Sequence, residues 1–236
     1  MLFITGITGS IGCGKSTVTQ MLGALGARIL DADQLAREVV GPGTTGLQAV
    51  VARFGSDILL HASSPQPVLD RRLLAERVFD NPKARQDLEA IIHPRVYHSM
   101  AATLARWEQE SNPDTFPIVA LEIPLLLENN ADALCDLIVV VACGDRQWER
   151  LQARNGMSAT SKKNIILQQL PESSKKKRAH WIIDNDGDLS MTMDQTKRLW
   201  DAIQERVRQQ APQAWPAQWH AFLSEPNEYS SQVSLF

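Results

Sequence analysis

This sequence predicts an α/β fold built on a parallel sheet, and three observations support the prediction. Short apolar runs recur along the chain, segments with helical periodicity lie between them, and a glycine-rich turn directly follows the first run. Apolar runs bounded by turn residues are typical of strands that are buried on both faces. The alternation of strand and helix favours strands joined by right-handed crossovers.

Five apolar runs are expected to form the sheet, at residues 2–7, 28–30, 116–121, 137–141 and 181–183. Helices are expected at residues 15–25, 33–40, 47–54, 70–79, 82–92, 94–110, 146–155 and 194–208. The roughly 85 residues between the second and third runs look wholly helical, which is far more than one crossover needs. We therefore expect an inserted helical domain between these two strands.

The composition is that of an ordinary globular chain. Its 236 residues are 44% hydrophobic and 22% charged, which excludes a disordered or fibrous class. The formal charge of −3 gives no long-range attraction to nucleic acid or membrane lipid, and neither partner is expected. Cys13, Cys135 and Cys143 have the spacing of neither a disulfide framework nor a zinc site, so we expect a reducing, cytoplasmic location. No signal peptide or membrane span is expected.

The glycine-rich turn is the most specific motif. Residues 9–17 fit the P-loop pattern G-x-x-x-x-G-K-[ST], after a strand and before a helix. Glycines let backbone N–H groups approach a phosphate, and the next helix directs its positive dipole end at the same anion. Lys15 is expected to bind the β- and γ-phosphates and Ser16 to bind Mg²⁺, whereas Cys13 is expected only to fill space. The expected nucleotide-binding residues are Gly9, Ser10, Ile11, Gly12, Cys13, Gly14, Lys15, Ser16 and Thr17.

ATP is the expected nucleotide, because the chain contains no Asn-Lys-x-Asp sequence for reading guanine. Two aspartates, Asp31 and Asp33, follow the second strand, where ligands of open α/β sheets bind. A carboxylate here can hold Mg²⁺ through water or accept the proton of an attacking hydroxyl, but it can also cap the next helix. For Asp31, capping and catalysis are equal alternatives, and for Asp33 a functional role is favoured.

Shorter motifs follow in order along the chain. They are Gly6 to Thr17, Asp31 to Asp33 with Ala36 and Arg37, Asp-Arg-Arg-x-Leu at 70–74, His93 and Pro94, Pro-Leu-Leu-x-Glu at 124–128, Gln-x-x-Arg-x-x-x-Arg at 147–154, Gln-x-Pro at 169–171 and Ile-Asp-Asn-x-Gly at 183–187. Together, over about residues 3–190, they resemble the dephospho-CoA kinase family. The resemblance implies transfer of the γ-phosphoryl group of ATP to the ribose 3′-hydroxyl of dephospho-CoA, the last step of coenzyme A biosynthesis.

The same resemblance implies roles for individual residues. Lys15, Asp33 and Arg150 would be catalytic, with Asp33 as the general base. Arg150 and Arg154 lie one helical turn apart and would reach the polyphosphate from a lid. Asn185 and Gly187 would lie near the adenine of ATP. The implied acceptor-binding residues are Asp33, Arg37, Arg72, His93, Pro94, Pro124 and Leu125. His180 stands where the family usually has Asp.

The expected organisation is a three-layer P-loop NTPase fold with a five-stranded parallel sheet, an inserted helical substrate domain and a lid. Residues 1–34, 116–145 and 180–210 would form the nucleotide-binding core, residues 35–115 the acceptor domain, residues 146–179 the lid and residues 211–236 a surface-packed or partly disordered tail.

Two other functions stay open. One is a P-loop kinase for a nucleoside, nucleotide or shikimate-like acceptor, and the other is a binding protein that uses ATP as a switch. The sequence gives no oligomeric state.

Overall fold

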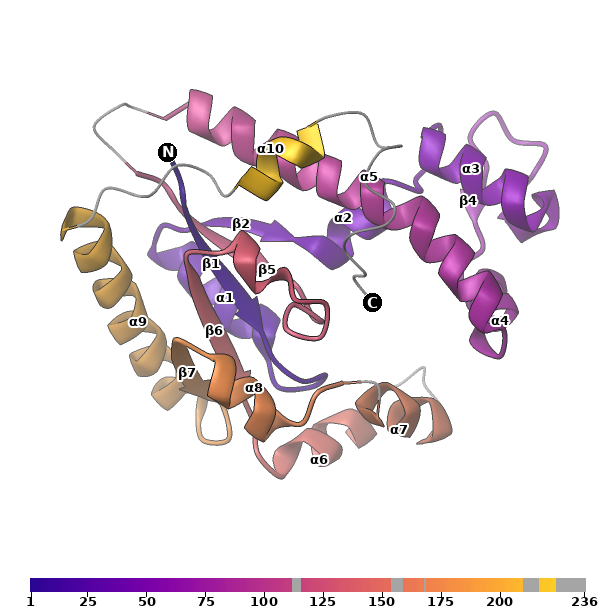
Figure 1. Ribbon diagram of the computed structural model, residues 1–236. Coiled ribbons are helices and arrows are strands. Elements are labelled where there is room, and N and C mark those ends of the chain that lie inside the picture. The colour runs from indigo at the N-terminus through magenta and orange to yellow at the C-terminus, as the bar shows by residue number, and fades with distance from the viewer. Residues whose placement is uncertain (112–115, 154–158, 168, 210–216, 224–236) are drawn as a thin grey trace.

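A computed structural model describes residues 1–111, 116–153, 159–167, 169–209 and 217–223 of the protein, and its centre is a five-stranded parallel sheet (Figure 1). The strands lie in the order β2-β5-β1-β6-β7. Their bounds are Phe3–Thr8 for β1, Arg28–Asp31 for β2, Ile118–Glu122 for β5, Leu137–Ala142 for β6 and Trp181–Asp184 for β7. The five-stranded α/β sheet that the apolar runs predict is thereby confirmed, with strand ends close to those expected.

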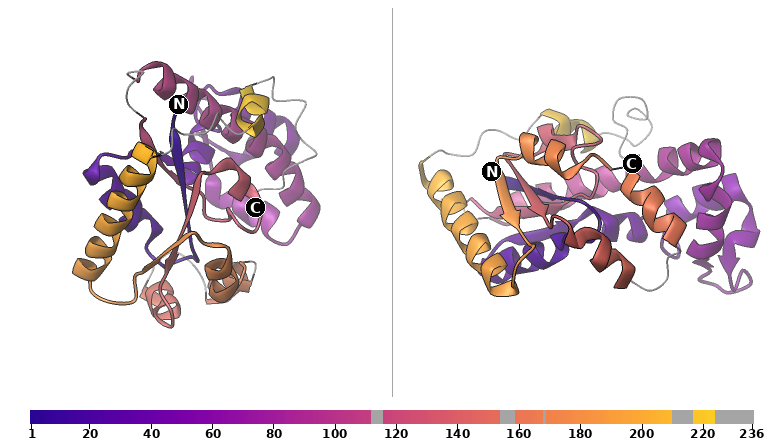
Figure 2. Two further views of the ribbon diagram at one scale, coloured as in Figure 1. Left: turned by 60° about the vertical axis from the view of Figure 1, so that its left-hand side comes forward. Right: turned by 90° about the horizontal axis from the view of Figure 1, so that it is seen from below.

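Helices cover both faces of this sheet (Figures 1 and 2), which is why every residue of β1, β5 and β6 is buried. On one face, α1 (Lys15–Leu25) and α9 (Leu189–Gln209) contribute side chains such as Val18 and Leu199 to one apolar core. On the other face, α2 (Ala32–Glu38) and α5 (Pro82–Gln109) pack over a second core. None of the described helices, the 28-residue α5 included, combines the length and apolar character of a membrane span.

Glycine in the left-handed conformation bounds α1 at both ends. Gly14 precedes the helix with φ 85° and Gly26 follows it with φ 119°. An added Cβ at Gly14 would lie 2.2 Å from the side-chain amide of Asn185, so glycine is needed there for space as well as for backbone conformation. The helix therefore begins at the residue after the glycine-rich turn, and its N-terminus faces that turn.

The segment between β2 and β5 has a small core of its own. This core is formed by α3 (Thr45–Phe54), α4 (Arg71–Phe79), the first half of α5 and the 3-10 turn η1 (Ser56–Ile58). The prediction that this segment is wholly helical is wrong at one place, where β3 (Leu59–Leu60) and β4 (Val68–Leu69) form a hairpin. Each strand has only two residues, too few for an alternating pattern to be visible in the sequence.

The prediction of two helices separated before Pro94 is also wrong. Helix α5 runs through Pro94 without interruption, although proline removes a helical hydrogen bond at a cost of about 3 kcal/mol. Apolar residues on both sides of Pro94 are buried: Ala84 in the small core, and Val96, Met100 and Leu104 in the core beside the sheet. Packing at both ends offsets the lost bond and keeps the helix continuous.

Three helices lie between β6 and β7: α6 (Arg146–Ala153), α7 (Ala159–Leu167) and α8 (Glu172–Arg178). The turn η2 (Ala131–Leu134) lies between β5 and β6.

Part of the expected tail is an ordered helix, α10 (Ala217–Leu223), which the sequence analysis did not predict. Trp219 is fully buried, and its indole Nε1 donates to the Leu134 carbonyl at 2.9 Å. The Phe222 ring stacks on the Tyr97 ring of α5 at 4.3 Å between centroids. These contacts attach α10 to α5 and η2. The other tail residues, 211–216 and 224–236, lie outside the described residues.

Cys13 and Cys143 are joined by a disulfide, although the cysteine spacing predicted no disulfide framework. The two residues are 130 positions apart in the sequence. Strands β1 and β6 pair in parallel, with Thr8 opposite Val140, so the loops that leave these two strands lie side by side. The spacing of cysteines along the sequence could not predict this disulfide, because the pairing of β1 with β6 brings the two residues together.

Replacing Trp219 with alanine should lower the free energy of unfolding by about 3–5 kcal/mol, because it leaves a cavity and an unsatisfied carbonyl. Leu223→Ala, in the same helix but 38% exposed, is the matched control and should lower it by less than about 1 kcal/mol. Chemical denaturation of both variants measures the difference. Equal stabilities would mean that α10 does not contribute to the core.

Candidate active site

A cavity of about 420 Å³ opens at the carboxyl ends of β1, β2 and β5. Its walls come from four parts of the chain: the glycine-rich loop, the start of α2, the end of β5 with the turn after it, and the segment between β6 and β7. The functional candidates that line it are Ile11, Gly12, Gly14, Lys15, Ser16, Thr17, Asp33, Glu122, Pro124, Leu125, Arg150 and Gln169. Residues far apart in the sequence thus share one site.

The glycine-rich loop folds around the ammonium group of Lys15. Lys15 Nζ donates to the carbonyls of Gly9 at 3.0 Å and Ser10 at 3.3 Å. Ser10 and Cys13 are buried and are not among the residues that line the described cavity. Their place is the structural side of the loop, while Lys15 and the residues around it form the side that a phosphate can reach.

Glu122, the last residue of β5, is a site residue that the sequence analysis missed. The hydroxyl of Ser16 donates to its Oε1 at 3.0 Å. Burial raises the pKa of this carboxyl, and hydrogen bonds from Thr19 and Ser16 act in the opposite direction. The signal was present, because an acidic residue that ends an apolar run beside the P-loop strand must lie at the ligand-binding edge of the sheet.

The two aspartates after β2 have different positions. Asp31 caps α2, since its Oδ1 accepts from the backbone N–H of Asp33 at 2.8 Å and of Gln34 at 3.2 Å. The capping alternative for Asp31 is therefore confirmed, and the catalytic alternative stays a prediction. Asp33 lies in the first turn of α2 and lines the cavity. Partial loss of solvent and the charge of Asp31 raise its pKa, whereas Lys15 and Arg37 lower it.

Side chains from the segment between β6 and β7 close over the glycine-rich loop. Arg150 donates to the Asn185 carbonyl at 2.7 Å. Gln147 Nε2 donates to the Ile11 carbonyl at 3.2 Å, and the Ile11 N–H donates to Gln169 Oε1 at 2.9 Å. Arg154 lies outside the described residues. The loop backbone at Ile11 is therefore held by two glutamine side chains in this state.

A second cavity of about 300 Å³ adjoins the first, and Gly12, Gly14, Thr17 and Arg150 line both. Asn185, Gly187 and Leu189 complete its walls. The Asn185 amide donates to the Cys13 carbonyl at 2.8 Å and accepts from the Thr192 hydroxyl at 2.8 Å. Asn185 thus fixes the loop on the side of β7.

The acceptor-binding residues implied by the resemblance do not all lie at one cavity. Asp33, Pro124 and Leu125 line the 420 Å³ cavity, but among the described side chains Arg37, Arg72, His93 and Pro94 do not.

The arginine that meets Arg37 is Arg71, which the sequence analysis did not single out. Its Nη2 donates to the Arg37 carbonyl at 2.9 Å. Partial loss of solvent and the nearby Arg37 charge lower the pKa of Arg71. The side chain of Arg72 is 85% exposed and lies 3.9 Å from Glu76. The run of two arginines gave no means of choosing between them.

Two side chains near the site have structural partners. The side chain of Lys175 is fully buried, and its Nζ lies 2.8 Å from Glu128 Oε1, which also accepts from the Leu170 N–H at 3.0 Å. This pair joins α8 to the turn after β5. His180 Nδ1 accepts from the Ile138 N–H at 2.9 Å, so the imidazole extends the pairing of β6 and β7 at its amino-terminal end.

Comparison with known proteins gives a consistent result. Residues 3–191 match the family model described as dephospho-CoA kinase. The dephospho-CoA kinase of Geobacter metallireducens is 40% identical over 200 residues, covering 84% of this chain and 96% of its own. That of Anaeromyxobacter dehalogenans is 37% identical over 217 residues, covering 92% and 99%.

Among solved structures, TT1252 from Thermus thermophilus aligns with a TM-score of 0.68 at 30% identity, covering 86% of this chain and 97% of its own. The dephospho-CoA kinase from Campylobacter jejuni aligns with a TM-score of 0.64 at 24% identity, covering 87% and 98%, and supports the fold.

His93 gives stability a defined pH dependence. It is 8% exposed, and burial lowers its pKa from 6.5 to about 4. The unfolded chain takes up this proton first, so the stabilisation from neutral His93 is complete above pH 6.5 and is lost as the pH falls toward about 4. Relative to His93→Gln, the parent should lose roughly 3 kcal/mol of unfolding free energy across this window. Denaturation at several pH values measures it.

The exposed residue His61, changed to Asn, is the control and should keep the slope of the parent. An unchanged slope in His93→Gln would contradict the assignment to His93.

Proposed function

Because the chain belongs to the dephospho-CoA kinase family, we propose that it transfers the γ-phosphoryl group of ATP to the ribose 3′-hydroxyl of dephospho-CoA, giving CoA and ADP. The observation that carries the proposal is the common cavity, which has the P-loop lysine and Ser16 on one wall and the carboxylate of Asp33 on another. A phosphate donor and a hydroxyl acceptor that enter this cavity from the two sides meet between these groups.

The donor side is formed by the P-loop and the lid. Backbone N–H groups of the loop and the N-terminus of α1 favour the β-phosphate, and Lys15 adds a full positive charge. Arg150, which lines both cavities, is placed to stabilise the charge that spreads over the transferred oxygens. In this proposal Arg154 also binds the polyphosphate, and the adenine lies in the 300 Å³ cavity near Asn185 and Gly187.

The residues at the end of β5 fit a magnesium ion. Mg²⁺ prefers oxygen ligands, and here a serine hydroxyl lies 3.0 Å from a buried carboxylate oxygen. Ser16 and Glu122 would hold the ion, directly or through water. When bound, it would neutralise charge on the β- and γ-phosphates.

Asp33 is the proposed general base. It must accept the proton of the 3′-hydroxyl, so it must be ionised when the acceptor binds. The environment raises its pKa, which makes the carboxylate a better proton acceptor than an ordinary aspartate. Lys15 and Arg37 lie near enough for their charges to limit this rise.

The acceptor side is proposed to extend from Pro124 and Leu125 toward the helical domain of residues 35–115. Arg37 and Arg71 are adjacent and both cationic, which suits the pyrophosphate of dephospho-CoA. In this arrangement Arg72 would contact the acceptor only from the solvent side, and His93 and Pro94 would support the domain as parts of α5. The cytoplasmic location and the division into core, acceptor domain, lid and tail stay predictions.

The test is to mix the purified protein with Mg²⁺, ATP and dephospho-CoA and to detect CoA by mass, with AMP, adenosine and shikimate as parallel acceptors. Formation of CoA alone supports the proposal. Phosphorylation of a different acceptor would replace dephospho-CoA as the substrate. ATP hydrolysis that no acceptor alters would favour the nucleotide switch.

Asp33→Asn should lower kcat by about 10²- to 10⁴-fold. The parent rate should fall as the pH drops through the raised pKa of Asp33, above 3.8, and the variant should lack this limb. Asp31→Asn is the matched control, because asparagine also caps helices and should keep most of the rate. A near-normal rate for Asp33→Asn would exclude it as the base.

Glu122→Gln should raise the Mg²⁺ concentration for half-maximal rate by about 10- to 100-fold and leave the KM for dephospho-CoA nearly unchanged. Titration of the rate with Mg²⁺ measures the effect. Asp136→Asn is the control, because Asp136 is a carboxylate of raised pKa that binds the Ile4 N–H before β6 begins. If both variants respond alike, Glu122 has no specific relation to the metal.

A further inference from the structure

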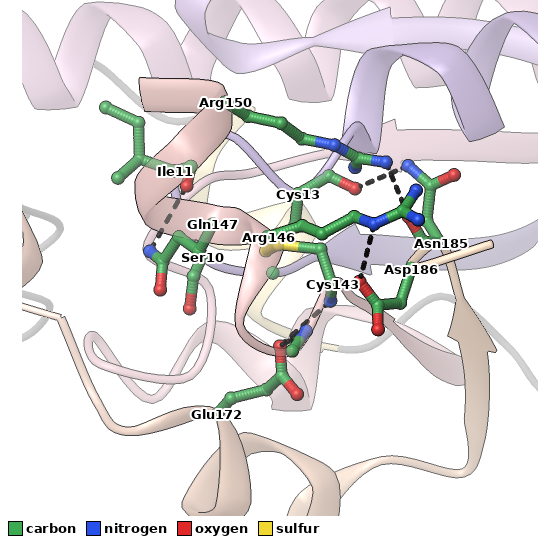
Figure 3. The surroundings of a disulfide bond; sticks show 12 residues. Ser10, Ile11, Cys13, Cys143, Arg146, Gln147, Arg150, Glu172, Asn185 and Asp186 are labelled. Atoms are coloured by element: carbon green, nitrogen blue, oxygen red, sulfur yellow. Dashed lines mark hydrogen bonds and ion pairs between the residues drawn. A yellow bond between two sulfur atoms is a disulfide. The ribbon is translucent and has the colours of Figure 1, made fainter. Parts of the chain in front are cut away.

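The disulfide connects the phosphate-binding loop to the start of the lid. Cys13 lies inside the loop, and Cys143 is the first residue after β6, three residues before the start of α6, the helix that carries Arg150 (Figure 3). Both cysteines are fully buried. We propose that this bond is a reversible thiol–disulfide switch, exchanging with a low-molecular-weight thiol, that sets the affinity of the loop for nucleotide. The inference rests on the proposed function only in requiring that the loop binds nucleotide.

The two sides of the bond are held with different strength. Cys143 follows a central strand, and its N–H and that of Gly144 both donate to Glu172 Oε2, at 2.9 Å and 3.3 Å. Cys13 lies between Gly12 and Gly14, each with φ 85°, in a loop without regular structure. When the bond is cut, the loop side is therefore the one that moves.

Reduction of the disulfide separates the two sulfur atoms and so displaces the loop side. Bonded sulfurs lie about 2.05 Å apart, whereas unbonded sulfurs need a separation of about 3.5 Å or more. Because both side chains are buried in close-packed surroundings, we expect side-chain rotation to supply little of this distance and the backbone around Cys13 to supply most of it. That backbone carries the carbonyl that accepts from Asn185 at 2.8 Å, and its N–H groups belong to the phosphate site.

The number of bonds that hold the loop determines whether reduction raises or lowers its affinity for nucleotide. In the oxidised state the loop is held by the disulfide, by Asn185 at Cys13, and by Gln147 and Gln169 at Ile11. Reduction removes the covalent attachment and gives the loop more conformations, which nucleotide binding must then restrict. The reduced protein should bind nucleotide more weakly, and by linkage bound nucleotide should make the disulfide harder to reduce.

Reduction by an external thiol proceeds in two exchange steps. The thiolate of one external thiol attacks a protein sulfur, forms a mixed disulfide and releases the other cysteine. A second external thiol attacks the mixed disulfide and leaves as the external disulfide. Two electrons pass from the two external thiols to the protein, and their two protons end on Cys13 and Cys143. The Glu172 carboxylate lies within 4.8 Å of both sulfurs and disfavours thiolates there, so exchange should be slow.

The test equilibrates the whole protein in glutathione buffers of stepped reduced-to-oxidised ratio, with and without ADP, then alkylates the free thiols and locates them by peptide mass. We expect one two-electron transition at Cys13 and Cys143, shifted by ADP toward more reducing buffers. Calorimetry should give a Kd for ADP about fivefold or more higher for the reduced protein. Because ADP binding is measured, failure to phosphorylate dephospho-CoA would leave this test intact.

Cysteine variants separate the effect of the disulfide from other effects of the redox buffer. Cys143→Ser and Cys143→Ala should both bind ADP like the reduced parent and ignore the redox buffer. Cys135→Ser changes the cysteine that forms no disulfide and should keep the response. Equal ADP affinity in both redox states, absence of the bond in every buffer, or absence of ADP binding would overturn the proposal. So would one Zn²⁺ per reduced protein that accounts for the same effect, since Cys13, Cys143 and Glu172 would then be a metal site.

Discussion

The parallel pairing of β1 with both β5 and β6 is the constraint on which the rest of the structure depends. Thr5 pairs with Ala120 on one side and with Leu137 on the other, so three buried strands end at the same edge of the sheet. The glycine-rich loop and the segment that leads to α6 begin directly beyond those ends, and Glu122 is the last residue of β5. Backbone hydrogen bonding within the sheet therefore brings the site together, before any side chain contributes.

This constraint explains why so much of the fold was predictable. Strands buried on both faces must be apolar throughout, so the runs at β1, β5 and β6 were visible without any partner. The P-loop was equally visible, because the backbone conformation around Gly12 and Gly14 admits few other residues. Lys15, Ser16 and Asp33, which were singled out from these two signals and a family resemblance, line one cavity.

The remainder depended on contacts that a sequence pattern does not record. Helix α5 passes through Pro94 because two separate cores hold its halves, and Trp219 is buried because η2 offers a carbonyl. Arg71 donates to the Arg37 carbonyl while Arg72 is exposed beside Glu76, a difference between neighbouring arginines that the sequence alone does not show. The disulfide belongs to the same class, since it reflects the register of two strands and not the positions of cysteines along the chain.

The continuity of α5 also has a mechanical meaning. A helix of 28 residues is about 42 Å long, and this one is embedded in the helical domain at its start and against the sheet farther along. Helix α2 packs on it through Leu35, Ala36 and Val39. A continuous helix of this kind joins the two cores mechanically, and α2 packs on it. Any shift of α3 and α4 against the sheet would therefore have to pass along α5, and it would reach the contact with α2, the helix whose first turn holds Asp33.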